Sequence, residues 1–268
     1  CVPGTSDARK ADIYRLLRQA TFGPTDALYS QVEQMGISAW IDAQLAAPKS
    51  TYPVQPFVSF TAPDSCSATG RAATDPAFIC ARDNYTLFPV QTRFLQNAIA
   101  GNDQLRQRVA FAFSQIMVTS GTEIYHPYGM GRYQQIMLDN AFGNFRSLLQ
   151  EMTLSPAMGR YLDMANSNKP DPVRGIAANE NFARELLQLF SVGLYKLNQD
   201  GTVQRDNAGV PIPAYDQEMI EELARVRTDA LLGYNLVDLD ANRGARRCSA
   251  QLLGEEAPAE PSQREENR

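Results

Sequence analysis

The densest group of potentially reactive side chains lies between residues 179 and 190. Two carboxylates, two side-chain amides and an arginine fall within seven residues: Asn179, Glu180, Asn181, Arg184 and Glu185. Apolar residues recur here at helical spacing and predict an amphipathic helix that Gly193 ends; they are Phe182, Leu186, Leu189 and Phe190. Because successive helical residues are rotated by about 100°, Glu185 falls at the border of the apolar face and is expected to be half-buried.

These residue types suit the hydrolysis of a polysaccharide, which uses one carboxyl group as proton donor and a second, ionised carboxylate as base or nucleophile. Glu185, beside the apolar face, suits the first role, and Glu180 or Asp163 suits the second. We expect other side chains to bind the substrate: Arg184, Asn181, Tyr161, Tyr195, Tyr125 and His126. An esterase is a weaker hypothesis, because there is no Gly-x-Ser-x-Gly motif and the single histidine has no evident serine partner.

The same residues also have ordinary structural interpretations. Glu180 and Arg184 are spaced as an i,i+4 ion pair, Asn179 as a helix cap, and His126 precedes a proline as turn residues do. The second functional hypothesis is therefore a non-catalytic helical scaffold or binding protein that works with a surface partner. Nucleotide-binding motifs such as Gly-x-Gly-x-x-Gly are absent from the sequence, so nucleotide chemistry is poorly supported.

Composition and cysteines indicate an exported protein. The net charge of −5 argues against nucleic-acid binding, and no apolar run approaches the roughly 20 residues of a membrane helix. The chain begins at Cys1 without a methionine, which suggests a trimmed signal peptide and a secreted or periplasmic location, with lipid attachment at Cys1 as an alternative. Cys66 and Cys80 are expected to form a disulfide worth about 3 kcal/mol, rather than two free thiols.

No cofactor is expected from the residue patterns. The Cys-x-x-Cys spacing of a structural zinc site is missing, and one histidine cannot build a multi-histidine metal site. The oxygen-rich loop from Asp163 to Asp171 is a candidate for calcium, but its spacing fits no EF-hand and ordinary turn chemistry is the favoured interpretation.

Hydrophobic periodicity predicts a mainly α fold, a multi-helix orthogonal bundle with a small β-hairpin after the central helix. Trp40 is expected to anchor the core, and Asp103 to cap a helix whose apolar face runs through Leu105, Val109 and Phe113, with Arg106 and Arg108 outside. The predicted helices cover residues 11–22, 25–35, 38–45, 84–100, 104–119, 132–140, 144–153, a short helix ending near 164, 179–190 and 219–226. The predicted parts are a leader or linker at 1–10, a helical domain at 11–226 with a disulfide-pinned loop at 48–83 and a hairpin near 197–213, and an atypical, partly disordered tail at 227–268.

Four blocks of sequence occur in a characteristic order: LLRQATFGPT at 16–25, QLRQRVAF at 104–111, AFGNF at 141–145 and NENFAREL at 179–186. Together they resemble the DUF1800 family of bacterial proteins. The resemblance implies an exported protein, often encoded beside a DUF1501 partner, with no established reaction.

The sequence also departs from that family's pattern. Members often carry histidines where this chain has Phe113, Ser114 and Phe190, so the resemblance implies no histidine-based metal chemistry here. After Ala224-Arg225-Val226 the usual Phe-Thr-Gly-Trp is replaced by Arg227-Thr228-Asp229-Ala230, which we interpret as a truncated or frameshifted member.

Overall fold

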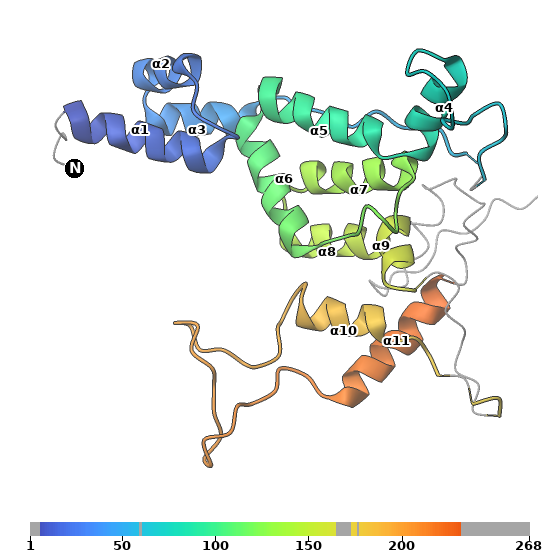
Figure 1. Ribbon diagram of the computed structural model, residues 1–268. Helices are drawn as coiled ribbons and strands as arrows, with labels where there is room; N and C mark the ends of the chain where they lie inside the picture. The colour runs from blue at the N-terminus through green and yellow to red at the C-terminus, as the bar shows by residue number, and fades with distance from the viewer. Residues whose placement is uncertain (1–5, 59–60, 165–172, 176, 232–268) are drawn as a thin grey trace, which may run out of the picture. The chain divides into compact units, whose positions relative to one another are not determined.

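The computed structural model describes residues 6–58, 61–164, 173–175 and 177–231 (Figure 1). The described part is mainly helical, which confirms the predicted class. Its helices are α1 (Ser6–Ala20), α2 (Asp26–Met35), α3 (Ile37–Ala46), α4 (Pro76–Tyr85), α5 (Phe88–Ala100), α6 (Gln104–Ile116), α7 (Pro127–Asp139), α8 (Phe145–Thr153), α9 (Pro156–Tyr161), α10 (Asn181–Gln188) and α11 (Gln217–Leu231). Cys1, residues 165–172 of the calcium candidate loop and residues 232–268 of the predicted tail lie outside the described residues.

The chain divides into two compact units. We call Cys1–Tyr161 together with Leu189–Ser191 the N-terminal unit, and Leu162–Gln188 together with Val192–Arg268 the C-terminal unit. The single helical domain expected over residues 11–226 remains a prediction, which this division into compact units does not test.

The first helices of the N-terminal unit enclose an apolar cluster. Ile13, Leu17 and Ala20 from α1 meet Val32 from α2 and Trp40 from α3, and each side chain is buried. Trp40 is fully buried, which confirms its predicted role as a core anchor. The Thr25 side chain accepts a hydrogen bond from the Leu28 N–H and caps α2, as its position predicts.

One helix was missed by the periodicity argument. Residues 76–85, placed in the long loop, form α4, which begins at Pro76 with the Asp75 carboxylate accepting from the Ala77 N–H. The buried side chains of α4 are Ala77 and Ala81, whereas its larger apolar residues Phe78 and Ile79 are half-buried and exposed, so its buried face gives no strong hydrophobic pattern. The predicted disulfide is confirmed: Cys66 and Cys80 are joined with Cα atoms 5.1 Å apart, and the bond ties the preceding loop to α4.

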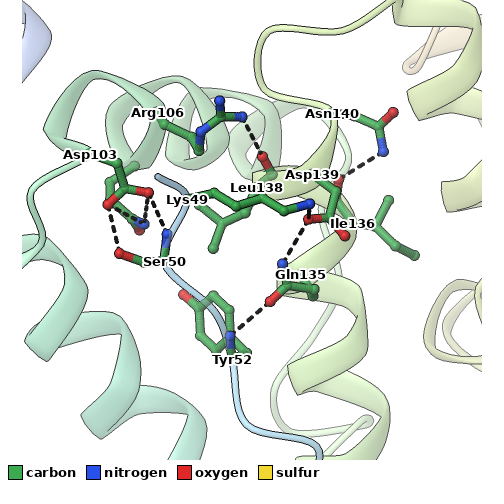
Figure 2. A network of polar contacts seen from close by, with 11 residues as sticks. Lys49, Ser50, Tyr52, Asp103, Arg106, Gln135, Ile136, Leu138, Asp139 and Asn140 are labelled. Atoms are coloured by element: carbon green, nitrogen blue, oxygen red, sulfur yellow. Dashed lines mark hydrogen bonds and ion pairs between the residues drawn. The ribbon is translucent and has the colours of Figure 1, made fainter. Parts of the chain in front are cut away.

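A buried polar cluster fastens α6 into the N-terminal unit (Figure 2). Asp103 precedes α6 and was predicted to cap it. The prediction is wrong, because the Asp103 carboxylate makes no capping hydrogen bond to the helix. The carboxylate is fully buried and accepts hydrogen bonds from the Ser50 N–H at 2.8 Å, from the Ser50 hydroxyl at 2.6 Å and from the Gln107 amide at 3.2 Å. The turn before α6 is therefore bonded to a segment 53 residues away in sequence.

Two glutamine side chains extend this cluster. The Gln104 amide donates to the carbonyl oxygens of Ala98 at 3.1 Å and Gly101 at 2.8 Å, where α5 ends. The Gln44 amide donates to the Asn102 carbonyl at 3.0 Å and accepts from the Leu105 N–H at 3.1 Å. These amides satisfy backbone groups that helix ends leave unpaired. We call Asp103, Gln104, Gln107, Gln44 and Ser50 the polar clasp.

The buried surface of α6 extends beyond the predicted apolar face. Leu105, Val109 and Phe113 are half-buried, and the buried residues of α6 are Gln104, Gln107 and Ala110. Arg106 and Arg108, expected outside, are half-buried. The Arg106 guanidinium lies 4.4 Å from the Phe142 ring centroid and donates to the Leu138 carbonyl (Figure 2). Helix α6 contacts four other helices, α1, α3, α5 and α7. It is therefore packed on several sides, whereas a single apolar stripe predicts packing on one.

In the C-terminal unit, α10 and α11 pack through Ala183, Ile220 and Ala224. The central helix is shorter than predicted, because α10 ends at Gln188 and Leu189 is exposed. The small β-hairpin expected between the two helices is not confirmed, since the described residues form three isolated antiparallel bridges there: Tyr195 with Pro213, Leu197 with Val203 and Arg205 with Pro211.

The backbone between α10 and α11 closes into a ring instead. The Lys196 N–H donates to the Ile212 carbonyl at 2.9 Å, the Ile212 N–H to the Gln204 carbonyl at 3.0 Å, and the Gln204 N–H to the Lys196 carbonyl at 2.8 Å. These three residues are spaced eight apart, with turns at Gly201 and Gly209, where φ is 82° and 81°. Pro211 and Pro213 have no N–H to donate, which prevents a longer ladder.

We predict that Asp103→Ala strongly destabilises the N-terminal unit. The substitution leaves the Ser50 and Gln107 donors buried without their acceptor, and the expected loss is about 3 kcal/mol of unfolding free energy. Urea denaturation of the variant measures it. The matched control is Asp12→Ala, which removes an exposed carboxylate paired with Arg15 and should change stability by less than about 1 kcal/mol. Equal effects of the two substitutions would contradict the role given to Asp103.

Candidate functional site

The Glu180 carboxylate belongs to a contact between α10 and α11. The Arg184 guanidinium donates to Glu180 Oε2 at 2.9 Å, as the i,i+4 spacing predicts, and the Gln217 amide donates to the same oxygen at 2.9 Å. Arg184 also donates to Gln217 Oε1 at 3.2 Å. Glu180 and Arg184 are therefore already engaged in joining two helices, which is the structural interpretation of this pair.

Glu185 is half-buried, as expected from its place at the border of the apolar face. Its Oε2 atom is buried and has no hydrogen-bond partner among the residues that the structure describes. Glu180 precedes α10, and its Oε2 atom is held by Arg184 and Gln217, whereas Glu185 lies within the helix. The Glu180 carboxylate is therefore already engaged in a contact that does not include Glu185.

Asp163 and the two asparagines occupy turn and cap positions. The Asn179 side chain accepts from the Asn181 N–H at 2.9 Å, which confirms Asn179 as a cap of α10, and it donates to the Asp163 backbone carbonyl at 3.3 Å. Asp163 has a left-handed backbone, with φ of 55°, and its side chain is exposed. Asn181 is exposed at the first turn.

The predicted site residues are divided between the two units. The catalytic candidates Asp163, Glu180 and Glu185 belong to the C-terminal unit, together with Arg184, Asn181 and the exposed Tyr195. The predicted aromatic and imidazole residues Tyr125, His126 and Tyr161 belong to the N-terminal unit.

The N-terminal unit contains an open pocket whose nine lining residues include four aromatic side chains. Its volume is about 730 Å³, within the range of small-molecule sites. Helix α4, the start of α5 and the segment after α6 contribute the lining residues, which are Phe78, Arg82, Tyr85, Thr86, Leu87, Phe88, Gln91, Gly121 and Tyr125. We call this the aromatic pocket. Tyr125 is the one predicted site residue that lines it.

Arg82 is held rigidly in the wall of the aromatic pocket. Its Nε donates to Asp83 Oδ1 at 2.6 Å and its Nη2 to Asp83 Oδ2 at 3.0 Å, and the guanidinium carbon lies 4.6 Å from the Phe88 ring centroid. The hydrogen bonds that Arg82 donates to Asp83 raise the pKa of this half-buried guanidinium, so it stays charged. Thr86 then ends α4: its hydroxyl donates to the Arg82 carbonyl at 2.6 Å and accepts from the Phe88 N–H.

His126 lies behind the rim of the aromatic pocket. Its imidazole centroid is 4.3 Å from the Tyr125 ring and 6.1 Å from the Tyr85 ring. Burial, and secondarily the positive charge of Arg160, lower the pKa of His126 below its usual value of 6.5. His126 also occupies the cap position before Pro127 and α7, in agreement with its interpretation as a turn residue. It therefore supports two pocket tyrosines as a neutral ring at physiological pH.

The pocket residues that sequence reasoning missed lie on α4 and α5. Phe78, Arg82 and Tyr85 are spaced i, i+4 and i+7, which places them on one face of a helix. The signal that identifies this helix is Asp75-Pro76, a cap followed by a proline at the first helical position. Phe88 and Gln91 are three residues apart at the start of α5, which also places them on one helix face. Their convergence with Tyr125 depends on tertiary packing.

Metal binding finds no support in the described part of either unit. Across these residues, no three His, Cys, Asp or Glu side chains are grouped as a metal site requires. The calcium candidate loop contributes Asp163 alone to the described residues, so that hypothesis stays a prediction.

The fold and the pocket together define a mainly helical protein with a disulfide-tied aromatic site. In the described part of the chain, no helix combines the length and hydrophobicity that a membrane span requires. The family model described as "Protein of unknown function (DUF1800)" matches residues 15–252, so the chain belongs to the DUF1800 family. The match includes part of the segment from 227 that was expected to be atypical. No curated protein and no solved structure matches the chain.

We predict that His126 makes stability fall toward acidic pH. Its lowered pKa means that the folded state prefers the neutral imidazole, so this contribution is complete above about pH 6.5 and is lost as the pH falls through the folded-state pKa. Urea denaturation at about pH 7, 6 and 5 should show a smaller loss of stability in His126→Gln than in the unsubstituted protein. Parallel losses in the two proteins would contradict the prediction.

Proposed function

We propose that the protein is an exported binding protein for an extracellular polysaccharide and that the aromatic pocket is its ligand site. The observation that carries the proposal is the convergence of four aromatic side chains with a fixed guanidinium and an amide around one open pocket. Sugar rings have apolar faces that stack on aromatic rings and hydroxyl groups that need polar partners at their edges. An open pocket also lets a polymer continue beyond the bound residue.

The disulfide supports an extracellular location for this site. Stable disulfides form in oxidising compartments, and the Cys66–Cys80 bond ends on α4, the helix that carries Phe78, Arg82 and Tyr85. A secreted or periplasmic protein meets polysaccharides outside the cytoplasm. A partner protein of the DUF1501 type, which the family resemblance implies, is the alternative ligand to the polysaccharide.

We predict that Tyr85→Ala and Tyr125→Ala each weaken polysaccharide binding about tenfold, because each removes one stacking face from the pocket. Titration of a soluble polysaccharide, followed by calorimetry, measures the dissociation constants. Tyr195→Ala is the matched control, since Tyr195 is an exposed tyrosine of the C-terminal unit and should leave the affinity unchanged. If Tyr195→Ala alone weakens binding, the ligand site lies elsewhere.

A second candidate function is polysaccharide hydrolysis with Glu185 as the proton donor. The observation that favours it is the buried Oε2 atom of Glu185, which lacks a hydrogen-bond partner among the described residues. A desolvated carboxyl group is typical of general acids in catalytic sites. The engagement of Glu180 by Arg184 and Gln217 weighs against it.

The binding proposal predicts that the protein releases no reducing sugar from a polysaccharide that it binds, and that Glu185→Gln binds the polymer with unchanged affinity. The substitution keeps the side-chain shape and removes the ionisable group. A reducing-sugar assay on both proteins, with their thermal midpoints measured in parallel, tests this. Turnover that disappears in Glu185→Gln without a change in thermal midpoint would establish the hydrolase instead.

A further inference from the structure

We propose that the aromatic pocket selects acidic polysaccharides and that the carboxylate of a uronic acid binds the free edge of Arg82. This inference rests on the proposed function and names the ligand class for the same site.

The hydrogen bonds of Arg82 leave one edge of its guanidinium available. A guanidinium carries five N–H donors, one on Nε and two on each terminal nitrogen. Asp83 accepts from Nε and Nη2, which together form the edge nearest the side-chain stem. Two donors on Nη1 and one on Nη2 remain, and these two nitrogens form a second edge that matches the two oxygens of a planar carboxylate.

This free edge is held in a defined orientation and is reachable from solvent. The Asp83 carboxylate and the Phe88 ring fix the guanidinium plane before any ligand binds. The Arg82 side chain is 34% exposed and lines the aromatic pocket. A preorganised guanidinium loses little conformational freedom on binding, which favours a bidentate carboxylate contact.

The charges around the pocket agree with an acidic ligand. Among the described lining residues, Arg82 is the one charged side chain, so no lining carboxylate repels an acidic sugar there. Asp83 offsets part of the guanidinium charge, since the two side chains pair directly. Selectivity therefore depends on the directional hydrogen bonds of the free edge more than on net positive charge, and a lysine at this position cannot reproduce it.

The test compares two forms of one polymer, polygalacturonate and its fully methyl-esterified form, which differ in carboxylate charge. We expect the full-length protein to bind the acidic form about tenfold more tightly by calorimetry. In Arg82→Lys and Arg82→Gln the ratio of the two affinities should fall to about one. The control Arg71→Gln removes another ion-paired arginine that does not line the pocket, and it should keep the ratio of the unsubstituted protein.

The outcomes separate the two levels of the proposal. Equal affinities for the acidic and esterified polymers overturn the acidic selectivity and leave the proposed function intact. Absence of binding to both polymers and to a panel of neutral glucans overturns the proposed function as well. Polyglutamate bound as tightly as polygalacturonate identifies an acidic-peptide site and overturns the sugar class. If the Arg82 variants do not fold, Asp83→Asn provides the second variant. The Asn side-chain oxygen can still accept a hydrogen bond from Arg82, Phe88 still lies against the guanidinium and the free edge is retained, so the preference for the acidic form should stay at about tenfold. Loss of that preference in folded Asp83→Asn overturns the inference.

Discussion

The buried carboxylate of Asp103 is the constraint on which the N-terminal unit depends. It is fully buried and accepts hydrogen bonds from neutral donors, the Ser50 backbone, the Ser50 hydroxyl and the Gln107 amide. A charge in the interior is tolerated when hydrogen bonds replace the lost water, and it becomes very unfavourable when they are removed. This requirement fixes the segment around Ser50 against the start of α6.

Other contacts extend that attachment toward α7. The Lys49 ammonium pairs with Asp139 at 2.6 Å, and the Tyr52 N–H donates to the Gln135 side chain at 2.8 Å (Figure 2). Helix α6 also contacts α5, and α4 and α5 contact each other and α7. The aromatic pocket is formed by α4, α5 and the segment after α6, so its shape follows from how these helices are held together.

Much of the fold can be predicted from the sequence where one physical signal dominates. Apolar periodicity identified the cluster around Trp40, and cysteine spacing identified the Cys66–Cys80 bond. Helix α4 was missed because it buries small alanines. The buried face of α6 was missed because two of its three buried residues are hydrogen-bonded glutamines. The segment predicted as a hairpin does turn at Gly201 and Gly209, but local turn signals do not specify which backbone groups pair across it.

The candidate site shows a similar limit. A dense cluster of carboxylates and amides at 179–185 is visible in the sequence, yet Glu180, Arg184 and Gln217 have an evident use in joining α10 to α11. The aromatic pocket draws on residues from 78 to 125, and their convergence depends on packing between helices. Tyr125 was identified by its residue type alone. Arg82 is a candidate ligand-binding residue because Asp83 and Phe88 orient its guanidinium, and only the structure shows those contacts.

Hydrogen exchange measured by mass spectrometry, with and without saturating polygalacturonate, tests the central claim most directly. Ligand binding in the aromatic pocket predicts slower exchange in peptides covering α4, the first turns of α5 and residues 121–126, with α10 unchanged. Protection confined to α10 and α11 would contradict this account and place the ligand at the Glu180–Glu185 helix.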